Sequence, residues 1–243
     1  MRSYEQRTKR FYLFIAFGLA WSLIATMLTE PALPSASFTL FIAIAPLFAA
    51  YVLHITSYPQ SFLDRSLMRI RPNIWWICAL LIPILYGAVL VSTYSLPLLS
   101  TVYHPLWVLV FFYCLFQEIG WRAFYQRELH VYSFWFSSLT VGAISACWHI
   151  PIVLVLFQAT DLQIIALICF HLLSAAPLAF MIATSRSVIP AAIMHTLFLL
   201  LFILSISFIQ AFIVYSSMLL LLNGLIMLMN AVFPQLYKQT FTL

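Results

Sequence analysis

The stretch "PLWVLVFFYCLFQEIGWRAFYQREL", residues 105–129, decides the fold class and raises the functional question. Eleven uncharged, mostly apolar residues from Pro105 to Leu115 are typical of a membrane-spanning helix. A glutamine, a glutamate and an arginine then follow as Gln117, Glu118 and Arg122. Ionised side chains near a bilayer centre cost about 2.5–3.5 kcal/mol each on insertion scales, so these residues require a structural or chemical role.

The whole chain shares the apolar composition of this stretch. Of its 243 residues, 65% are hydrophobic and 7% are charged, and the mean hydropathy is +1.06. A soluble domain has about 25% charged residues, so the composition indicates an integral membrane protein. Five glycines and little polar–apolar alternation argue against a transmembrane β-barrel. We expect an all-α membrane protein in which residues 1–243 form a single integral membrane domain.

The apolar segments predict about eight transmembrane helices in a single bundle. A spanning helix needs about 20 mostly apolar residues, and the length of the segments favours helices over strands. The predicted spans are residues 11–29, 37–57, 74–94, 105–125, 134–157, 162–184, 188–209 and 212–233.

The basic residues sort onto one side of an eight-helix arrangement. All 11 Lys and Arg residues fall before the first helix or after the second, fourth, sixth and eighth, whereas the other loops carry only Glu30 and Asp161 as charges. By the positive-inside rule both termini are cytoplasmic, and we expect the plasma membrane of a bacterium. The net charge of +5 is therefore a topology signal. Membrane lipid is an expected partner and nucleic acid is not, because no soluble basic face is present.

Glu118 is the only acidic residue well inside a predicted span, and Arg122 follows four residues later on the same helical face. One interpretation is structural: a buried ion pair from which Arg122 extends to the cytoplasmic surface. The other is functional, because intramembrane ionisable groups commonly mark reaction or transport sites. Gln117 lies about 100° around an α-helix from Glu118, and alone it would serve as an interhelical hydrogen-bonding group.

Histidines in three later spans extend this polar set. His149 lies in "ISACWHIP", with Ser145 one helical turn before it, and His195 lies in "SRSVIPAAIMHTLFLL". His195 stands about 10 Å beyond the cytoplasmic start of its helix. Glu118 has a similar depth, so an antiparallel register could bring the two together. His149 is deeper by residue counting, and His171 in the sixth span has no predicted partner.

One carboxylate and two imidazoles on three helices form a general acid/base set. Glu118, His149 and His195 are therefore the candidate catalytic residues, with Gln117 and Arg122 as supporting residues. A carboxylate or an imidazole can deprotonate water, and an imidazole can donate to a developing oxyanion. The same side chains could bind a divalent metal, but HExxH is absent and no two histidines are four residues apart. We therefore predict chemistry without a metal or other cofactor.

Three segments together resemble the CAAX prenyl endopeptidase and bacteriocin-processing (CPBP, or Abi) family of intramembrane proteases. The family pattern is Glu-Glu-x-x-x-Arg on one helix, aromatic-x-x-x-His on the next and His-x-x-x-Asn on a later one. The matching residues here are Gln117-Glu118-Ile-Gly-Trp-Arg122, Ser145-Ala-Cys-Trp-His149 and His195-Thr-Leu-Phe-Leu199. The resemblance covers residues 117–199 and implies an endopeptidase that acts on membrane-associated peptides or small proteins.

Three positions depart from the family pattern. The resemblance implies that the first glutamate activates the attacking water with the second-motif histidine, and that the asparagine helps to bind the oxyanion. These two positions are Gln117 and Leu199 here, and the second-motif aromatic is Ser145. An amide cannot accept a proton at neutral pH, and losing one oxyanion donor costs about 10²–10³ in rate.

Two functions therefore remain open. In the first, the chain is an endopeptidase in which Glu118 is the base or supports His149, and His195 holds the oxyanion. In the second, it is a non-catalytic homologue that binds a membrane peptide or protein partner in an immunity, regulatory or scaffold role. A third reading makes Gln117 an engineered Glu→Gln inactivation, which leaves Leu199 unexplained. A transporter is a more distant class, because no repeat or broken-helix pair supports it.

The charge distribution predicts the orientation of the chain. A reporter fused after Lys238 should be cytoplasmic, because basic residues near helix ends are retained on that side. Paired cytoplasmic and periplasmic reporters in a bacterial host measure this, and a fusion after Asp161 should give the opposite signal. A periplasmic signal from the Lys238 fusion would refute the predicted topology.

Overall fold

Helices account for all the regular structure within the residues that the computed structural model describes, which are 2–29, 35–57, 61–62, 68, 70, 73–94, 104–203 and 208–232. In chain order the elements are α1 (Arg2–Thr29), α2 (Ser35–Ser57), α4 (Ile74–Tyr94), α5 (His104–Gln117), η2 (Glu118–Gln126), α6 (Phe134–Phe157), α7 (Asp161–Ser185), α8 (Val188–Ile203) and α9 (Phe208–Val232). Because η2 continues α5 without a break, each of the eight predicted spans has a helical counterpart.

The helices have the length and apolar composition of membrane spans. Five of them, α1, α2, α6, α7 and α9, are long and apolar enough to cross a bilayer. Helices α4 and α8 contain shorter apolar segments, Ile74–Val89 and Val188–Leu200. The predicted all-α, multi-pass membrane fold is thereby confirmed.

The last span begins four residues earlier than the approximate prediction, and residues 204–207 before it lie outside the described residues. Helix α8 ends at Ile203 and α9 already begins at Phe208, whereas the sequence predicted a span to residue 209 and the next from 212. The sequence contains no glycine or proline between residues 191 and 222. Without those residues, an apolar run has no local signal for where one helix ends.

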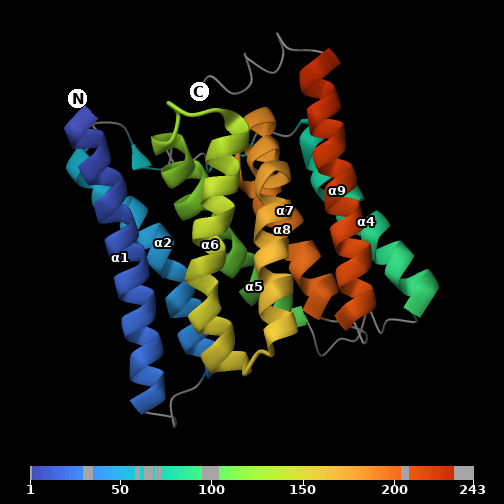
Figure 1. Cartoon of the computed structure of the whole chain (residues 1–243), viewed down its shortest axis with the longest axis horizontal. Helices are drawn as coiled ribbons and strands as arrows, with labels where there is room; N and C mark the ends of the chain where they lie inside the picture. The colour runs from blue at the N-terminus through green and yellow to red at the C-terminus, as the bar shows by residue number, and fades with distance from the viewer. Residues whose placement is uncertain are drawn as a thin grey trace.

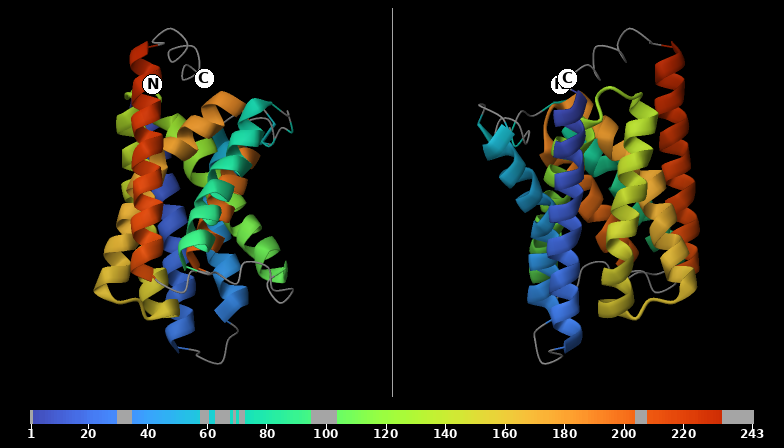
Figure 2. Two further views of the ribbon diagram at one scale, coloured as in Figure 1. Left: turned by 90° about the vertical axis from the view of Figure 1, so that its right-hand side faces the viewer. Right: turned by 60° about the vertical axis from the view of Figure 1, so that its left-hand side comes forward.

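The helices run up and down, so that α1 begins and α9 ends at the same end of the bundle (Figure 1). The connections from η2 to α6 and from α7 to α8 lie at that end too, while the α6–α7 turn lies at the opposite end (Figure 2). Arg127 and Arg186, in these connections, thus share an end with the basic start of α1. Other charges used in the topology prediction lie outside the described residues: Glu30, Arg65, Arg69, Arg71 and Lys238.

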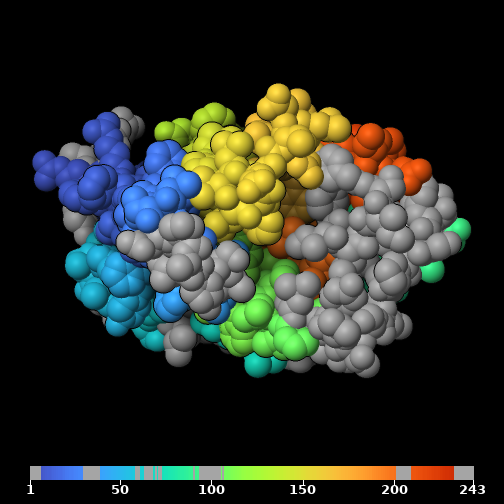
Figure 3. All heavy atoms as spheres, turned by 90° about the horizontal axis from the view of Figure 1, so that it is seen from below, coloured from blue at the N-terminus to red at the C-terminus, as the bar shows by residue number. Residues whose placement is uncertain are grey.

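The outer helices present large apolar side chains outward. Examples are Phe14 on α1, Ile77 on α4 and Leu221 on α9, each more than half exposed. In a membrane these side chains contact lipid rather than water. Figure 3, which looks from below, shows the ends of α1 and α2 in blue next to the α6–α7 end in yellow.

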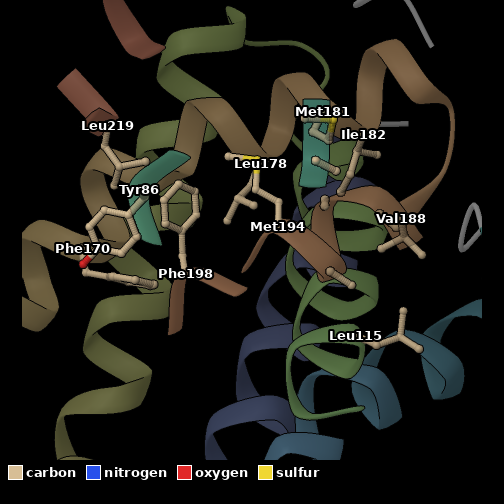
Figure 4. Close-up of a cluster of buried hydrophobic side chains, with 14 of the residues drawn as sticks. Tyr86, Leu115, Phe170, Leu178, Met181, Ile182, Val188, Met194, Phe198 and Leu219 are labelled. Carbon is tan, nitrogen blue, oxygen red and sulfur yellow. The ribbon is translucent and has the colours of Figure 1, made fainter. Parts of the chain in front are cut away.

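Two hydrophobic clusters fill the bundle, and η2 contributes to both. One cluster joins α1, α2 and α6, and it includes Trp121, Phe124 and Tyr125 of η2. The other joins α4, α5, α7, α8 and α9, and it includes Ile119 and Ala123 of η2 (Figure 4). Packing on both sides therefore fixes the position of η2 within the bundle.

Gly120 allows η2 to lie directly against α2. A Cβ atom at Gly120 would be 2.5 Å from both the carbonyl carbon and the Cβ of Pro46. Non-bonded carbon atoms make favourable contacts only at about 3.5–4.0 Å, so no side chain fits at this position. Glycine is required here because the two backbones touch.

The substitution Gly120→Ala should destabilise the protein by about 1–3 kcal/mol, because the added methyl group forces α2 and η2 apart. Gly18→Ala in α1 is the matched control, since no atom lies within 4 Å of the added Cβ. That control should be neutral or stabilising by up to about 1 kcal/mol. Thermal unfolding in detergent micelles measures both variants, and equal unfolding temperatures would contradict the close contact.

Candidate functional site

The carboxylate of Glu118 is the centre of a buried polar cluster. Its Oε1 atom lies 3.0 Å from Nη1 of Arg122 and 2.7 Å from Nδ1 of His195 on α8. Glu118 is 0% exposed, so its charge depends on these two partners for compensation. The structure thus contains the Glu118–His195 pairing that the depths of the two residues predict.

Arg122 stays inside the bundle. The structural interpretation extended this side chain to the cytoplasmic surface, but Arg122 is only 3% exposed. Its Nε and Nη2 atoms, and Oε2 of Glu118, have no hydrogen-bond partner among the described residues. A buried polar group left unpaired costs about 1–3 kcal/mol. The ion pair therefore has free hydrogen-bonding capacity, which suits a water molecule or a polar group of a substrate.

The segment that carries the first motif, η2, is a π-helix rather than the α-helix that the sequence predicts. In a π-helix the backbone hydrogen bonds join residues five apart, and such segments are frequent at functional sites. The expected angle of about 100° between Gln117 and Glu118 assumed an α-helix, so it does not apply to a π-helical segment. Packing on both sides holds η2 in the π-helical conformation. Local sequence signals do not report such tertiary contacts, so they do not distinguish a π-helix from an α-helix here.

The side-chain amide of Gln117 has a partner at each end. An indole N–H can only donate, so Oε1 of Gln117 must be the acceptor from Nε1 of Trp121. The amide nitrogen then faces the carbonyl oxygen of Ala43 on α2, at 3.5 Å. A carboxylate at this position could not donate to that carbonyl. The environment of Gln117 therefore fits glutamine and ties η2 to α2.

The imidazole of His149 is oriented by its own helix. Nδ1 lies 2.7 Å from the carbonyl oxygen of Ser145, one turn earlier in α6. Because a carbonyl oxygen only accepts, Nδ1 carries the hydrogen, and Nε2 of the neutral ring keeps a lone pair. His149 also lies close enough to His195 and Arg122 to interact with them electrostatically. Its own polar contact is with Ser145 rather than with Glu118.

Sequence reasoning missed His171 as a member of this group. Its ring centroid on α7 is 4.3 Å from that of His149, with 32° between the ring planes, and its Nδ1 lies 3.3 Å from Oγ of Ser145. The signal in the sequence was an intramembrane histidine without an assigned partner. The spacing of residues in the sequence does not show which residues of the fifth and sixth spans lie side by side. The contact between His149 and His171 therefore could not be derived.

The remaining motif position, Leu199, has an apolar environment. Its side chain packs against the cluster formed by Val110, Cys114 and Leu200. Nearby, the hydroxyl of Thr196, which follows His195 directly, donates to the carbonyl oxygen of Ala192 at 2.7 Å. Packing has therefore replaced hydrogen bonding at the place of the family's asparagine.

The side chains within the described part of the chain include no group of three His, Cys, Asp or Glu residues placed to hold a metal ion. The expectation of chemistry without a metal stays a prediction. It is best addressed by a chelator in an activity assay.

Comparison with known proteins gives a family match for the segment that carries the three motifs. Residues 99–201 match the family described as type II CAAX prenyl endopeptidase Rce1-like. No curated protein matches the chain. The matched segment contains all three motifs, from Gln117 to Leu199, and it includes Glu118 and both of the histidines that resemble the family pattern. This match supports the resemblance of the three motifs to the CAAX prenyl endopeptidase and bacteriocin-processing family.

Proposed function

We propose that the protein is an intramembrane endopeptidase that hydrolyses membrane-associated peptides or small proteins. The single observation that supports this most strongly is the buried hydrogen bond from His195 to Glu118, close to an imidazole of His149 whose tautomer is fixed. A buried acid/base set of this kind is expensive inside a membrane and favours a chemical role. The basic residues at the η2–α6 end favour an active site that faces the cytoplasm, in the plasma membrane of a bacterium.

In this mechanism His149 is the general base. Its Nε2 lone pair takes a proton from a water molecule, and the water oxygen forms a bond to the carbonyl carbon of the substrate. The carbonyl π electrons move to the oxygen and produce a tetrahedral oxyanion. When the C–N bond breaks, the leaving nitrogen takes the proton from Nε2 of His149. One water molecule is consumed, and the products are a carboxylic acid and an amine.

In the same mechanism Glu118 acts through His195. A carboxylate hydrogen-bonded to Nδ1 stabilises the charged imidazolium, as in serine protease triads. In this mechanism His195 enters the reaction as the imidazolium and keeps both protons throughout, donating hydrogen bonds from Nδ1 to Glu118 and from Nε2 to the oxyanion. Arg122 balances the charge of Glu118 and fixes its position. Glu118 is accordingly a positioning residue, whereas His149 and His195 contact the reacting atoms.

Specific observations favour a second candidate, a non-catalytic homologue that binds a membrane peptide or protein partner. The amide of Gln117 is engaged at both ends, and Leu199 packs against apolar side chains. Both positions thus serve packing between helices in this chain. A binding role needs no base or oxyanion donor at either position. Cleavage assays separate the two functions.

The variant His149→Gln should lower cleavage by at least about 10²-fold, because an amide cannot accept the proton of water. The measurement uses the protein in proteoliposomes with a library of quenched-fluorescent peptides, each carrying one palmitoyl chain. The control His130→Gln changes an exposed histidine in the turn after η2 and should keep full activity.

Unchanged cleavage by His149→Gln, with normal thermal unfolding, would remove His149 from the mechanism. A chelator should leave cleavage by the native chain unaffected, and loss of cleavage would instead require a metal. Glu118→Gln is less informative, because it leaves the buried charge of Arg122 without a counterion, at a cost of about 3–5 kcal/mol.

The variant Gln117→Glu should destabilise the protein by about 1–3 kcal/mol, because a carboxylate cannot donate to the Ala43 carbonyl. Gln126→Glu is the matched control: Nε2 of Gln126 donates to the hydroxyl of Ser138 at 2.9 Å, and that hydroxyl can reverse and donate to a carboxylate. Its effect on stability should be much smaller. Thermal unfolding in nanodiscs measures both variants, and equal effects would contradict the role of the Ala43 contact.

The same substitution also helps to decide between the two functions. If the native chain cleaves no peptide and the combined Gln117→Glu, Leu199→Asn variant does, the chain is the non-catalytic homologue. If the native chain cleaves and His149→Gln does not, the endopeptidase proposal stands.

A further inference from the structure

Ser145 connects two histidines from neighbouring helices. Its carbonyl oxygen accepts from Nδ1 of His149, and its hydroxyl lies 3.3 Å from Nδ1 of His171. The two imidazole rings stack with centroids 4.3 Å apart and planes 32° apart. The structure therefore forms a compact group of two imidazoles and one hydroxyl between α6 and α7, in which Ser145 and His149 stand at family-motif positions and His171 does not.

Gly142 makes this group sterically possible. A Cβ atom at Gly142 would be 2.7 Å from the carbonyl oxygen of His171 and 2.8 Å from Cβ of Ala175. Gly142 stands three residues before Ser145 and seven before His149, so it lies on the same face of α6. The close approach of α7 thus occurs where it brings His171 onto His149.

The hydroxyl of Ser145 is the hydrogen-bond partner of Nδ1 of His171. Serine hydroxyls in helices often donate to a carbonyl three or four residues earlier, as Ser137 does to Phe134. Among the described residues, the Ser145 hydroxyl has no such carbonyl acceptor, and Nδ1 of His171 is its one hydrogen-bond partner. A hydroxyl that donates to Nδ1 has an acceptor for its hydrogen and places the hydrogen of the neutral His171 ring on Nε2, whereas the opposite tautomer leaves the hydroxyl hydrogen without an acceptor among the described residues.

The two rings then present opposite hydrogen-bonding groups on one side. Both Nδ1 atoms face Ser145, and the ring planes are tilted by 32° with centroids 4.3 Å apart, so both Nε2 atoms lie on the parts of the rings away from the Ser145 contacts. Nε2 of His149 is an acceptor and Nε2 of His171 is a donor. A water molecule needs both kinds of partner. His149 and His171 also retain small accessible fractions, 6% and 3%, whereas Glu118 has none.

We propose that His171 is a further residue of the hydrolytic centre, whose Nε2–H holds the attacking water against Nε2 of His149. The role as attacking water rests on the endopeptidase function proposed above. In this arrangement His171 donates to the water oxygen and directs a water hydrogen to His149. It compensates for Gln117, whose amide has no proton-accepting group and is engaged with Trp121 and Ala43.

The tautomers of the two histidines test this proposal without a substrate. In the full chain, labelled with ¹⁵N-histidine and placed in lipid nanodiscs, solid-state NMR should show His149 protonated at Nδ1 and His171 protonated at Nε2. Ser145→Ala removes the hydroxyl but keeps the carbonyl. It should therefore release the tautomer of His171 and leave that of His149 unchanged. Identical tautomers in the native chain, or no response of His171 to Ser145→Ala, would overturn the proposal.

Cleavage of the palmitoylated peptide library provides the second test. His171→Phe keeps a stacked ring without a donor and should lower cleavage by about 10-fold or more. His171→Gln places an amide N–H near the position of Nε2–H and should restore part of that loss. If both variants unfold normally and lose activity equally, His171 serves packing alone and the proposal fails.

The two proposals fail in different ways. A native chain that cleaves nothing, but shows the opposite tautomers and the selective response to Ser145→Ala, disproves hydrolysis and retains the paired water site. A native chain that cleaves, but is insensitive to His171→Phe, disproves the role of His171 and retains the endopeptidase.

Discussion

A carboxylate with no exposed surface inside a membrane bundle must have partners, and this requirement organises the centre of the protein. Oε1 of Glu118 is paired with Arg122, four residues later, and with His195 from α8. Removing Arg122 would leave the Glu118 charge without its cationic partner in a low-dielectric interior, at a cost of several kcal/mol. The hydrogen bond between His195 and Oε1 of Glu118 therefore helps to fix the depth of α8 relative to η2.

Neighbouring residues of the first motif have different roles in the structure. Gln117 and Trp121 form one pair, which is linked to α2 through Ala43, while Glu118 and Arg122 form a second pair, which is linked to α8. In each pair the two residues are four positions apart in the sequence, and all four side chains are buried. The first pair holds helices together, and the second provides charged and acid/base groups. The segment thus keeps the spacing of the family pattern while Gln117, at the place of the first glutamate, serves contacts between helices.

Much of the fold could be predicted from the sequence, because every membrane span must be apolar along its length. The pairing of Glu118 with His195 was also predictable, since both depths can be counted from charged helix ends. The π-helical winding of η2 and the buried position of Arg122 could not be derived, because packing from both sides determines them. His171 was missed for a related reason: its contact with His149 depends on how closely α6 approaches α7 at Gly142. The start of α9 was predicted only approximately, since that apolar run has no residue that stops a helix.

The contact between Gly120 and Pro46 has a consequence for how the chain assembles after insertion. Helices in a bilayer are already surrounded by an apolar medium, so hydrophobic burial gives little force to align one against another. Correct alignment must then come from shape and from polar contacts. Gly120 packs against Pro46, and Gln117, three residues earlier, contacts the carbonyl oxygen of Ala43. Together these two contacts define one register of η2 along α2. Lateral association of α2 with η2 therefore selects its own register, and the polar residues of the motif reach their places as a result.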